Sequence, residues 1–160
     1  MTGIPFPRTG PRVIKDAPDH HDAELVLQLY ALRREPLLRE ARRYMTAEFW
    51  PASADDLLAI VKGDHPQNAA YRQVTSYWEM AYGMARQGIV NPDYLADNAS
   101  EGLFIFAKIE PWLGALREAR GPRDFRNAEW IATQCEAGRE LLLLLRKRVE
   151  TALAARSRRG

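Results

Sequence analysis

The chain has 160 residues, of which 46% are hydrophobic and 28% charged, a composition typical of one folded globular domain and not of a disordered chain. Its 23 basic and 21 acidic residues leave a net charge of only +2, so no global field attracts nucleic acid, and any such binding depends on a local patch. The single cysteine, Cys135, excludes an intrachain disulfide and two-cysteine metal motifs and favours a reducing, cytoplasmic location.

The first 18 residues are rich in residues that break helices. They contain Pro5, Pro7, Pro11, Pro18, Gly3 and Gly10. Because proline lacks an amide hydrogen and clashes with the preceding turn, we expect residues 1–18 to form a disordered arm. The rest of the chain is expected to form a single helical-bundle domain over residues 19–156, followed by a short basic tail at 157–160.

Two helical segments are predicted after the arm, with a proline between them. From Asp22 onward, apolar residues recur every three to four positions, which is the spacing of one buried helix face. They are Leu25, Val26, Leu29 and Leu32. Pro36 removes a backbone hydrogen bond, but the apolar period continues to Phe49, so we expect a kinked helix or two abutting helices. Ser53, followed by two aspartates, is typical of an N-cap and predicts a short helix that ends near Gly63.

The clearest helical pattern lies in the middle of the chain. Its apolar stripe ends at Gly88, a residue type that favours the left-handed turn after a helix. The stripe consists of Ala70, Tyr71, Val74, Tyr77, Trp78, Ala81 and Ala85, so that Trp78 is expected in the core. Asn91 and Pro92 then place a capping residue before a proline, which predicts a further helix or turn through Ala96.

The last third of the chain contains two more helical periods, separated by a glycine and a proline at 121 and 122. The first covers residues 103–116, and additional apolar residues widen its face, so we expect it to be the central helix. The second begins near Asp124 and is expected to continue to Leu153 as one long helix. The sequence therefore predicts an all-α fold, an irregular or antiparallel bundle of five to six helices.

We find no group of residues with the types and spacing of a catalytic or metal-binding set. The cluster Asp19-His20-His21-Asp22 has metal-binding residue types, but adjacent histidines point to different sides of a helix, and we interpret it as a helix start with an aspartate cap. His65 stands at a helix start without a nucleophile, and Cys135 lies on an apolar stripe, as a buried structural thiol does. No catalytic residue, metal ligand or cofactor is therefore predicted.

Aromatic residues on several predicted helices could line a ligand pocket. Their helical spacing favours core packing over a pocket. These residues are Tyr77, Trp78, Tyr82, Trp112 and Trp130.

Most arginines alternate with glutamates, including those around the turn at 121–122, and are interpreted as solvated faces of mixed charge. Residues 139–160 differ, because they contain seven basic and only two acidic residues. This end could contact phosphates or an acidic partner, although a solvated terminal tail is the simpler interpretation. The candidate polyanion contacts are Arg146, Arg148, Arg156, Arg158 and Arg159.

Five consecutive leucines occupy residues 141–145 of this basic end. At about 100° per residue they surround the helix, whereas a surface helix needs only one apolar face. Either this helix is central in the bundle, or its outer face meets another subunit. Because 103–116 competes for the central place, we expect a partner surface, most commonly supplied by a symmetric dimer. The predicted interface residues are Leu141, Leu143 and Leu144.

The two most apolar runs, residues 103–116 and 141–145, are too short or too charged to span a membrane.

Three segments in the middle of the chain, residues 73–79, 84–90 and 93–95, form one pattern. A helix with an aromatic-x-Glu pattern ends at a glycine, a short turn follows, and a second helix carries a tryptophan, here Trp112. This pattern resembles that of small all-helical bacterial domains of unknown function. The resemblance covers about residues 66–131. It implies an all-helical fold and transfers no catalytic residue.

The lack of a catalytic set and the surplus of apolar helix surface favour a non-enzymatic interaction or assembly module, which self-associates or docks as a subunit in a larger bacterial complex. One alternative is an accessory nucleic-acid-binding protein that uses the arginine-rich C-terminal end. A second is a ligand carrier or enzyme with an aromatic pocket between helices. A salt-dependent shift on DNA or RNA would favour the former, and a small molecule bound to the purified protein would favour the latter.

Overall fold

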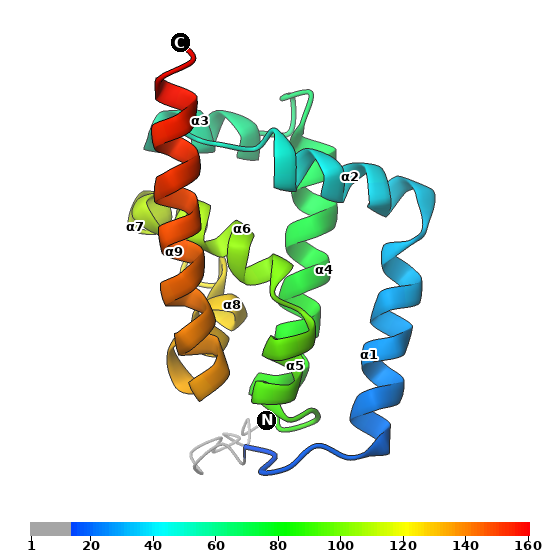
Figure 1. Cartoon of the computed structure of the whole chain (residues 1–160). Helices are drawn as coiled ribbons and strands as arrows, with labels where there is room; N and C mark the ends of the chain where they lie inside the picture. The colour runs from blue at the N-terminus through cyan, green and yellow to red at the C-terminus, as the bar shows by residue number, and fades with distance from the viewer. Residues whose placement is uncertain (1–13) are drawn as a thin grey trace, which may run out of the picture.

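The computed structural model describes residues 14–160, and every regular element in that range is helical (Figure 1). The elements are α1 (His20–Arg33), α2 (Pro36–Ala47), α3 (Ala54–Val61), α4 (Asn68–Arg86), α5 (Pro92–Asn98), α6 (Glu101–Ile109), the 3-10 turn η1 (Glu110–Trp112), α7 (Leu113–Arg120), α8 (Arg126–Gln134) and α9 (Glu136–Ser157). The all-α prediction is confirmed, but the expected number of five to six helices is too low. Most of the predicted arm, residues 1–13, lies outside the described residues.

The short segment before α1 is held on the helical body. It contains no helix, but Lys15 Nζ donates to Asp22 Oδ1 at 2.6 Å. The side-chain amide of Asn91 donates to Lys15 O at 2.9 Å. Asp22 is buried and also accepts a hydrogen bond from Asn91 N at 3.0 Å. These contacts fasten the segment and the start of α1 to the loop before α5.

Pro36 starts a new helix. α1 ends at Arg33, and the proline occupies the first turn of α2, where a missing amide hydrogen costs no helical bond. The Glu35 carboxylate caps α2 by accepting a hydrogen bond from Leu38 N at 3.0 Å. Of the two arrangements that the sequence allowed, two abutting helices are observed, and α2 crosses near the start of α4 at the top of Figure 1.

Ion pairs connect the start of α6 to α1 and α2. Glu101 accepts hydrogen bonds from Arg42 Nε at 3.1 and 3.0 Å and from the Arg33 guanidinium at 3.2 Å. Both arginines and the glutamate are largely shielded from solvent, so the charge-assisted bonds are stronger than those of an exposed pair.

The helix expected over residues 103–116 is divided at Pro111. A proline cannot donate the hydrogen bond that continues an α-helix, and its ring clashes with the carbonyl four residues earlier. The turn η1 takes the place of α-helix at this point, and α7 begins after it. Leu113 and Leu116 are still buried, so the apolar period persists through the break.

The prediction of one long helix from Asp124 to Leu153 is also wrong, because the helix is interrupted at Cys135. Cys135 is extended, with φ −118° and ψ 153°, and separates α8 from α9. The two helices approach so closely that a Cβ on Gly138 would lie 1.9 Å from Ile131 O. Asp93 Oδ1 accepts a hydrogen bond from Ala137 N at 2.8 Å and so caps the new helix. This contact comes from a distant part of the sequence, so the local pattern could not predict the break.

The core is built around α6 and α4. Every residue of α6 except Glu101 and Phe104 is buried, and the helix lies between α9 and α4 in Figure 1, as expected for the central helix. Trp78 on α4 is 3% exposed, so its predicted place in the core is confirmed. The hydroxyls of Tyr77 and Tyr82 on the same helix are buried, and each donates a hydrogen bond to a backbone carbonyl.

Candidate functional site

Helix α9 buries one side of its leucine run and exposes another. Leu142 and Leu145 are buried, and Leu141 is half-buried. Leu143 and Leu144 are 58% and 64% exposed. The helix lies along one edge of the bundle and contacts α5, α6 and α8 (Figure 1). It is therefore not the central helix, and the described part of the chain covers only one side of it.

The candidate polyanion contacts are spread along α9. Arg146 forms two hydrogen bonds with the Glu110 carboxylate. Arg158 and Arg159 follow the end of the helix and are exposed. The arginine nearest the leucines is thus neutralised by a partner on η1, while the two at the chain end point into solvent.

The other two candidate arginines lie over aromatic rings beside a buried lysine. The guanidinium of Arg148 is 6.0 Å from the centre of the Phe104 ring, and that of Arg156 is 5.4 Å from the Trp50 ring. Lys108 Nζ lies over the same two rings, at 4.5 Å from Phe104 and 4.0 Å from Trp50. Three cationic groups therefore share two rings at the α2–α6–α9 junction.

Lys108 caps the C-terminal end of α2. Its Nζ donates to Met45 O, Thr46 O and Phe49 O at 2.9, 3.0 and 3.1 Å. These carbonyls belong to the last turn of α2 and the residues after it, where the helix dipole attracts a cation. Burial, together with the charge of Arg156, lowers the pKa of Lys108 to about 7. We interpret this lysine as a structural cap, since its Nζ already has three backbone carbonyl acceptors within hydrogen-bond distance.

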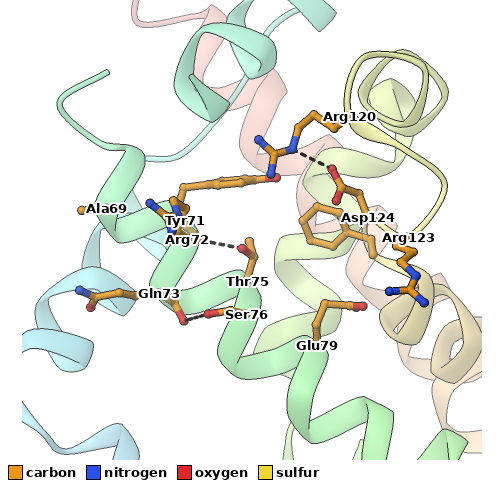
Figure 2. Close-up of a pocket in the computed structure, with 11 residues that line it drawn as sticks. Ala69, Tyr71, Arg72, Gln73, Thr75, Ser76, Glu79, Arg120, Arg123 and Asp124 are labelled. Atoms are coloured by element: carbon orange, nitrogen blue, oxygen red, sulfur yellow. Dashed lines mark hydrogen bonds and ion pairs between the residues drawn. The ribbon is translucent and has the colours of Figure 1, made fainter. Parts of the chain in front are cut away.

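A groove of about 600 Å³ lies between α4 and the turn that joins α7 to α8 (Figure 2). Its volume is within the range of small-molecule sites. Charged side chains line both of its walls. They are Arg72 and Glu79 from α4, and Arg120, Arg123 and Asp124 from the end of α7 and the following turn.

Both carboxylates of this groove are already engaged. Asp124 Oδ2 accepts a hydrogen bond from Arg120 Nε at 3.1 Å (Figure 2). Glu79 accepts hydrogen bonds from Asn127 N at 3.0 Å and Ala128 N at 2.7 Å. It thereby caps α8 from another helix, and burial raises the pKa of its carboxyl group.

The floor of the groove contains a backbone conformation that is rare for a large residue. Phe125 has φ 58° and ψ 22°, in the left-handed region, which costs about 1 kcal/mol or more for a residue with a Cβ. Its ring is buried and lies 6.4 Å from the Tyr71 ring and 6.3 Å from the Phe106 ring. This packing offsets the strain and fixes where the preceding turn, with Arg123 and Asp124, meets α4.

A void of about 10 Å³, the space of one water molecule, lies behind the groove and is lined in part by Thr75, Trp78 and Glu79. Trp78 Nε1 is buried, and no atom of residues 14–160 accepts its hydrogen. The aromatic residues of α4 otherwise pack on each other, with ring centres 4.9 Å apart for Tyr77 and Trp78. This is the packing that their helical spacing favours.

The other titratable candidates have structural partners. Asp19 caps α1 by accepting hydrogen bonds from the backbone amides of His21 and Asp22. His65 Nδ1 accepts a hydrogen bond from Gln67 N at 3.0 Å. Cys135 is buried, and burial raises the pKa of its thiol to about 11. Among the described residues, no group of three or more histidine, cysteine, aspartate or glutamate side chains could hold a metal ion.

Sequence reasoning missed the arginine-lined groove. The sequence favours a solvated face for the arginines near residue 121 and places Tyr71 in a core stripe. Both interpretations are locally sound, because Tyr71 is buried and Arg123 is exposed. The missing information was that the turn after α7 lies against α4, a contact between segments about 50 residues apart for which no sequence pattern exists.

These features define an all-helical domain that, over residues 14–160, presents an exposed leucine pair on α9 and an arginine-lined groove beside α4. Within that range, no helix is long and apolar enough to cross a membrane. The chain belongs to the family of the domain of unknown function DUF4760, whose model matches residues 18–135. The predicted resemblance to small domains of unknown function is thus confirmed, and α9 lies outside the matched residues. No curated protein and no solved structure matches the chain.

Proposed function

We propose that the protein is a non-enzymatic assembly module that self-associates through the outer face of α9. The observation that carries this proposal is the exposure of Leu143 and Leu144, at 58% and 64%, on a helix whose other side packs on its own chain. Covering such side chains with a second apolar surface yields about 25 cal/mol for each Å² removed from water. The half-buried Leu141 lies at the edge of the same face.

The charges around the leucine pair favour a second copy of the chain as the partner. Glu140 precedes the pair and Lys147 follows it, and at about 100° per residue both lie on the same side of α9 as the leucines. Two α9 helices that cross in opposite directions would place Glu140 of each beside Lys147 of the other. A twofold axis repeats this favourable contact at both ends of the leucine pair. A parallel pair would place like charges together.

Sedimentation velocity at micromolar concentration tests the proposal. The wild type should sediment as a dimer, and Leu144→Glu should raise its dissociation constant by about a hundredfold, because the interface would bury an unpaired charge. Leu27→Glu is the matched control: Leu27 is 69% exposed, but it lies on α1, so this variant should remain dimeric. Circular dichroism checks that each variant is folded.

Charge exchange tests the antiparallel pairing. Glu140→Lys and Lys147→Glu should each weaken the dimer, and the double variant should restore it, because the exchange recreates both opposite-charge contacts. A monomeric wild type, or a dimer that Leu27→Glu dissociates and Leu144→Glu does not, would contradict the proposal.

A further inference from the structure

The groove beside α4 is a separate site from the α9 face. Its walls come from α4 and from the segment that ends α7 and leads into α8, and no residue of α9 lines it (Figure 2). With a volume of about 600 Å³ it is concave and open, so a small molecule can enter without any movement of the backbone.

Two of its three arginines are available for a ligand. Arg120 donates its Nε hydrogen to Asp124, which leaves the terminal guanidinium nitrogens for other partners. Arg72 and Arg123 are exposed, and neither has a hydrogen-bond or ion-pair partner in the described part of the chain. Because Asp124 is paired and Glu79 is held by the amides of α8, the free charges that face the groove are positive.

A buried phenol adds a third donor. Tyr71 is only 5% exposed, yet its hydroxyl forms no hydrogen bond with any residue in the range 14–160. Figure 2 shows its ring extending across the groove toward Arg120 and Asp124. The hydroxyl is not among the fully buried polar atoms of the described residues, so it stays open to the groove and can donate its hydrogen to a ligand oxygen.

We propose that this groove binds a small phosphorylated molecule, whose phosphate groups accept hydrogen bonds from the Tyr71 hydroxyl and from the two arginines at the opposite sides of the groove, Arg72 and Arg123. Guanidinium groups match phosphate oxygens in geometry and charge. One arginine can satisfy both oxygens of a carboxylate, whereas two arginines from opposite walls and a phenol offer enough donors for the additional oxygens of a phosphate group. The donor set therefore favours phosphate over carboxylate ligands.

Isothermal titration calorimetry of the full chain with inorganic pyrophosphate tests this site, with citrate as a polycarboxylate of comparable charge. Pyrophosphate should bind saturably at physiological ionic strength and more tightly than citrate. Arg72→Ala and Arg123→Ala should each weaken pyrophosphate binding about tenfold or more, the usual effect of losing a charge-assisted contact. Tyr71→Phe keeps the ring and removes the hydroxyl, and it should weaken binding several-fold.

Arg34→Ala is the control for a general loss of positive charge, because Arg34 is exposed and lies outside the groove. It should leave binding unchanged. The inference is overturned if the wild type shows no saturable binding of pyrophosphate, if citrate binds equally well, or if Arg34→Ala weakens binding as much as Arg72→Ala. These measurements do not depend on self-association, so a monomeric protein would leave them unaffected.

Discussion

Helices α6 and α9 both carry a run of apolar residues, but they differ in what they bury. α6 lies at the centre of the bundle and buries a lysine, Lys108, which is 4% exposed. α9 lies at an edge and leaves Leu143 and Leu144 largely in solvent. The position of a helix among its neighbours therefore decides burial more than the residue types do. A polar group in the centre needs partners within the chain, and an apolar group at the edge gains from a partner outside it.

The largest expected effect is the removal of a leucine from α6. Leu103 is fully buried, so Leu103→Ala should lower the free energy of unfolding by about 2–5 kcal/mol, through lost burial and the cavity left behind. Urea denaturation followed by circular dichroism measures this change. A loss below about 1 kcal/mol would mean that the chain around α6 collapses easily into the space, and the contrast with α9 would be weaker than we infer.

A smaller effect is expected for Lys108→Met, which keeps an apolar chain of similar length and removes the nitrogen that donates to the carbonyl oxygens at the end of α2. We expect the free energy of unfolding to fall by about 1–3 kcal/mol at about pH 9. The loss should shrink toward about pH 6. Burial lowers the pKa of Lys108 from 10.5 to about 7, so between these values the unfolded chain binds a proton that the folded chain does not.

Raising the pH through this window therefore stabilises the wild type, and the methionine variant lacks this contribution. Urea denaturation of both proteins across the window measures the difference. A loss that is equal at both ends of the range would show that Lys108 remains protonated throughout, because the carbonyls and rings would then outweigh burial.

The smallest effect is expected for Leu143→Ala, the matched change on α9. At 58% exposure the side chain has little burial to lose, so the unfolding free energy of the dilute monomer should change by less than about 0.5 kcal/mol. Urea denaturation at low protein concentration measures this value. A loss close to that of Leu103→Ala would mean that Leu143 is covered by the chain itself, and the comparison would fail.

Helix boundaries that depend on neighbouring residues were predictable. Ser53 accepts the hydrogen bond of a capping residue, Asn91 does the same for α5, and Gly88 has a positive φ after α4. The effect of Pro111 was within reach of local reasoning too, since a proline inside a helical period interrupts it. These features were accessible because their causes lie within four residues.

The break at Cys135 and the groove could not be predicted in this way. The break depends on the close approach that Gly138 permits and on the Asp93 carboxylate. The groove depends on where the turn after α7 meets α4, and Phe125 reaches the left-handed region without any of the residue types that signal it. The structure adds the contacts between distant segments, and the candidate ligand site is made of such contacts.

The carboxylates that cap the starts of α8 and α9 have a consequence for the synthesis of the protein on the ribosome. Glu79 and Asp93 belong to α4 and α5, so each emerges from the exit tunnel before the helix that it caps. When residues 126–137 emerge, both carboxylates that accept hydrogen bonds from their backbone amides have therefore already been synthesised. The direction of translation thus allows each of these two capping contacts to form as soon as its helix leaves the tunnel.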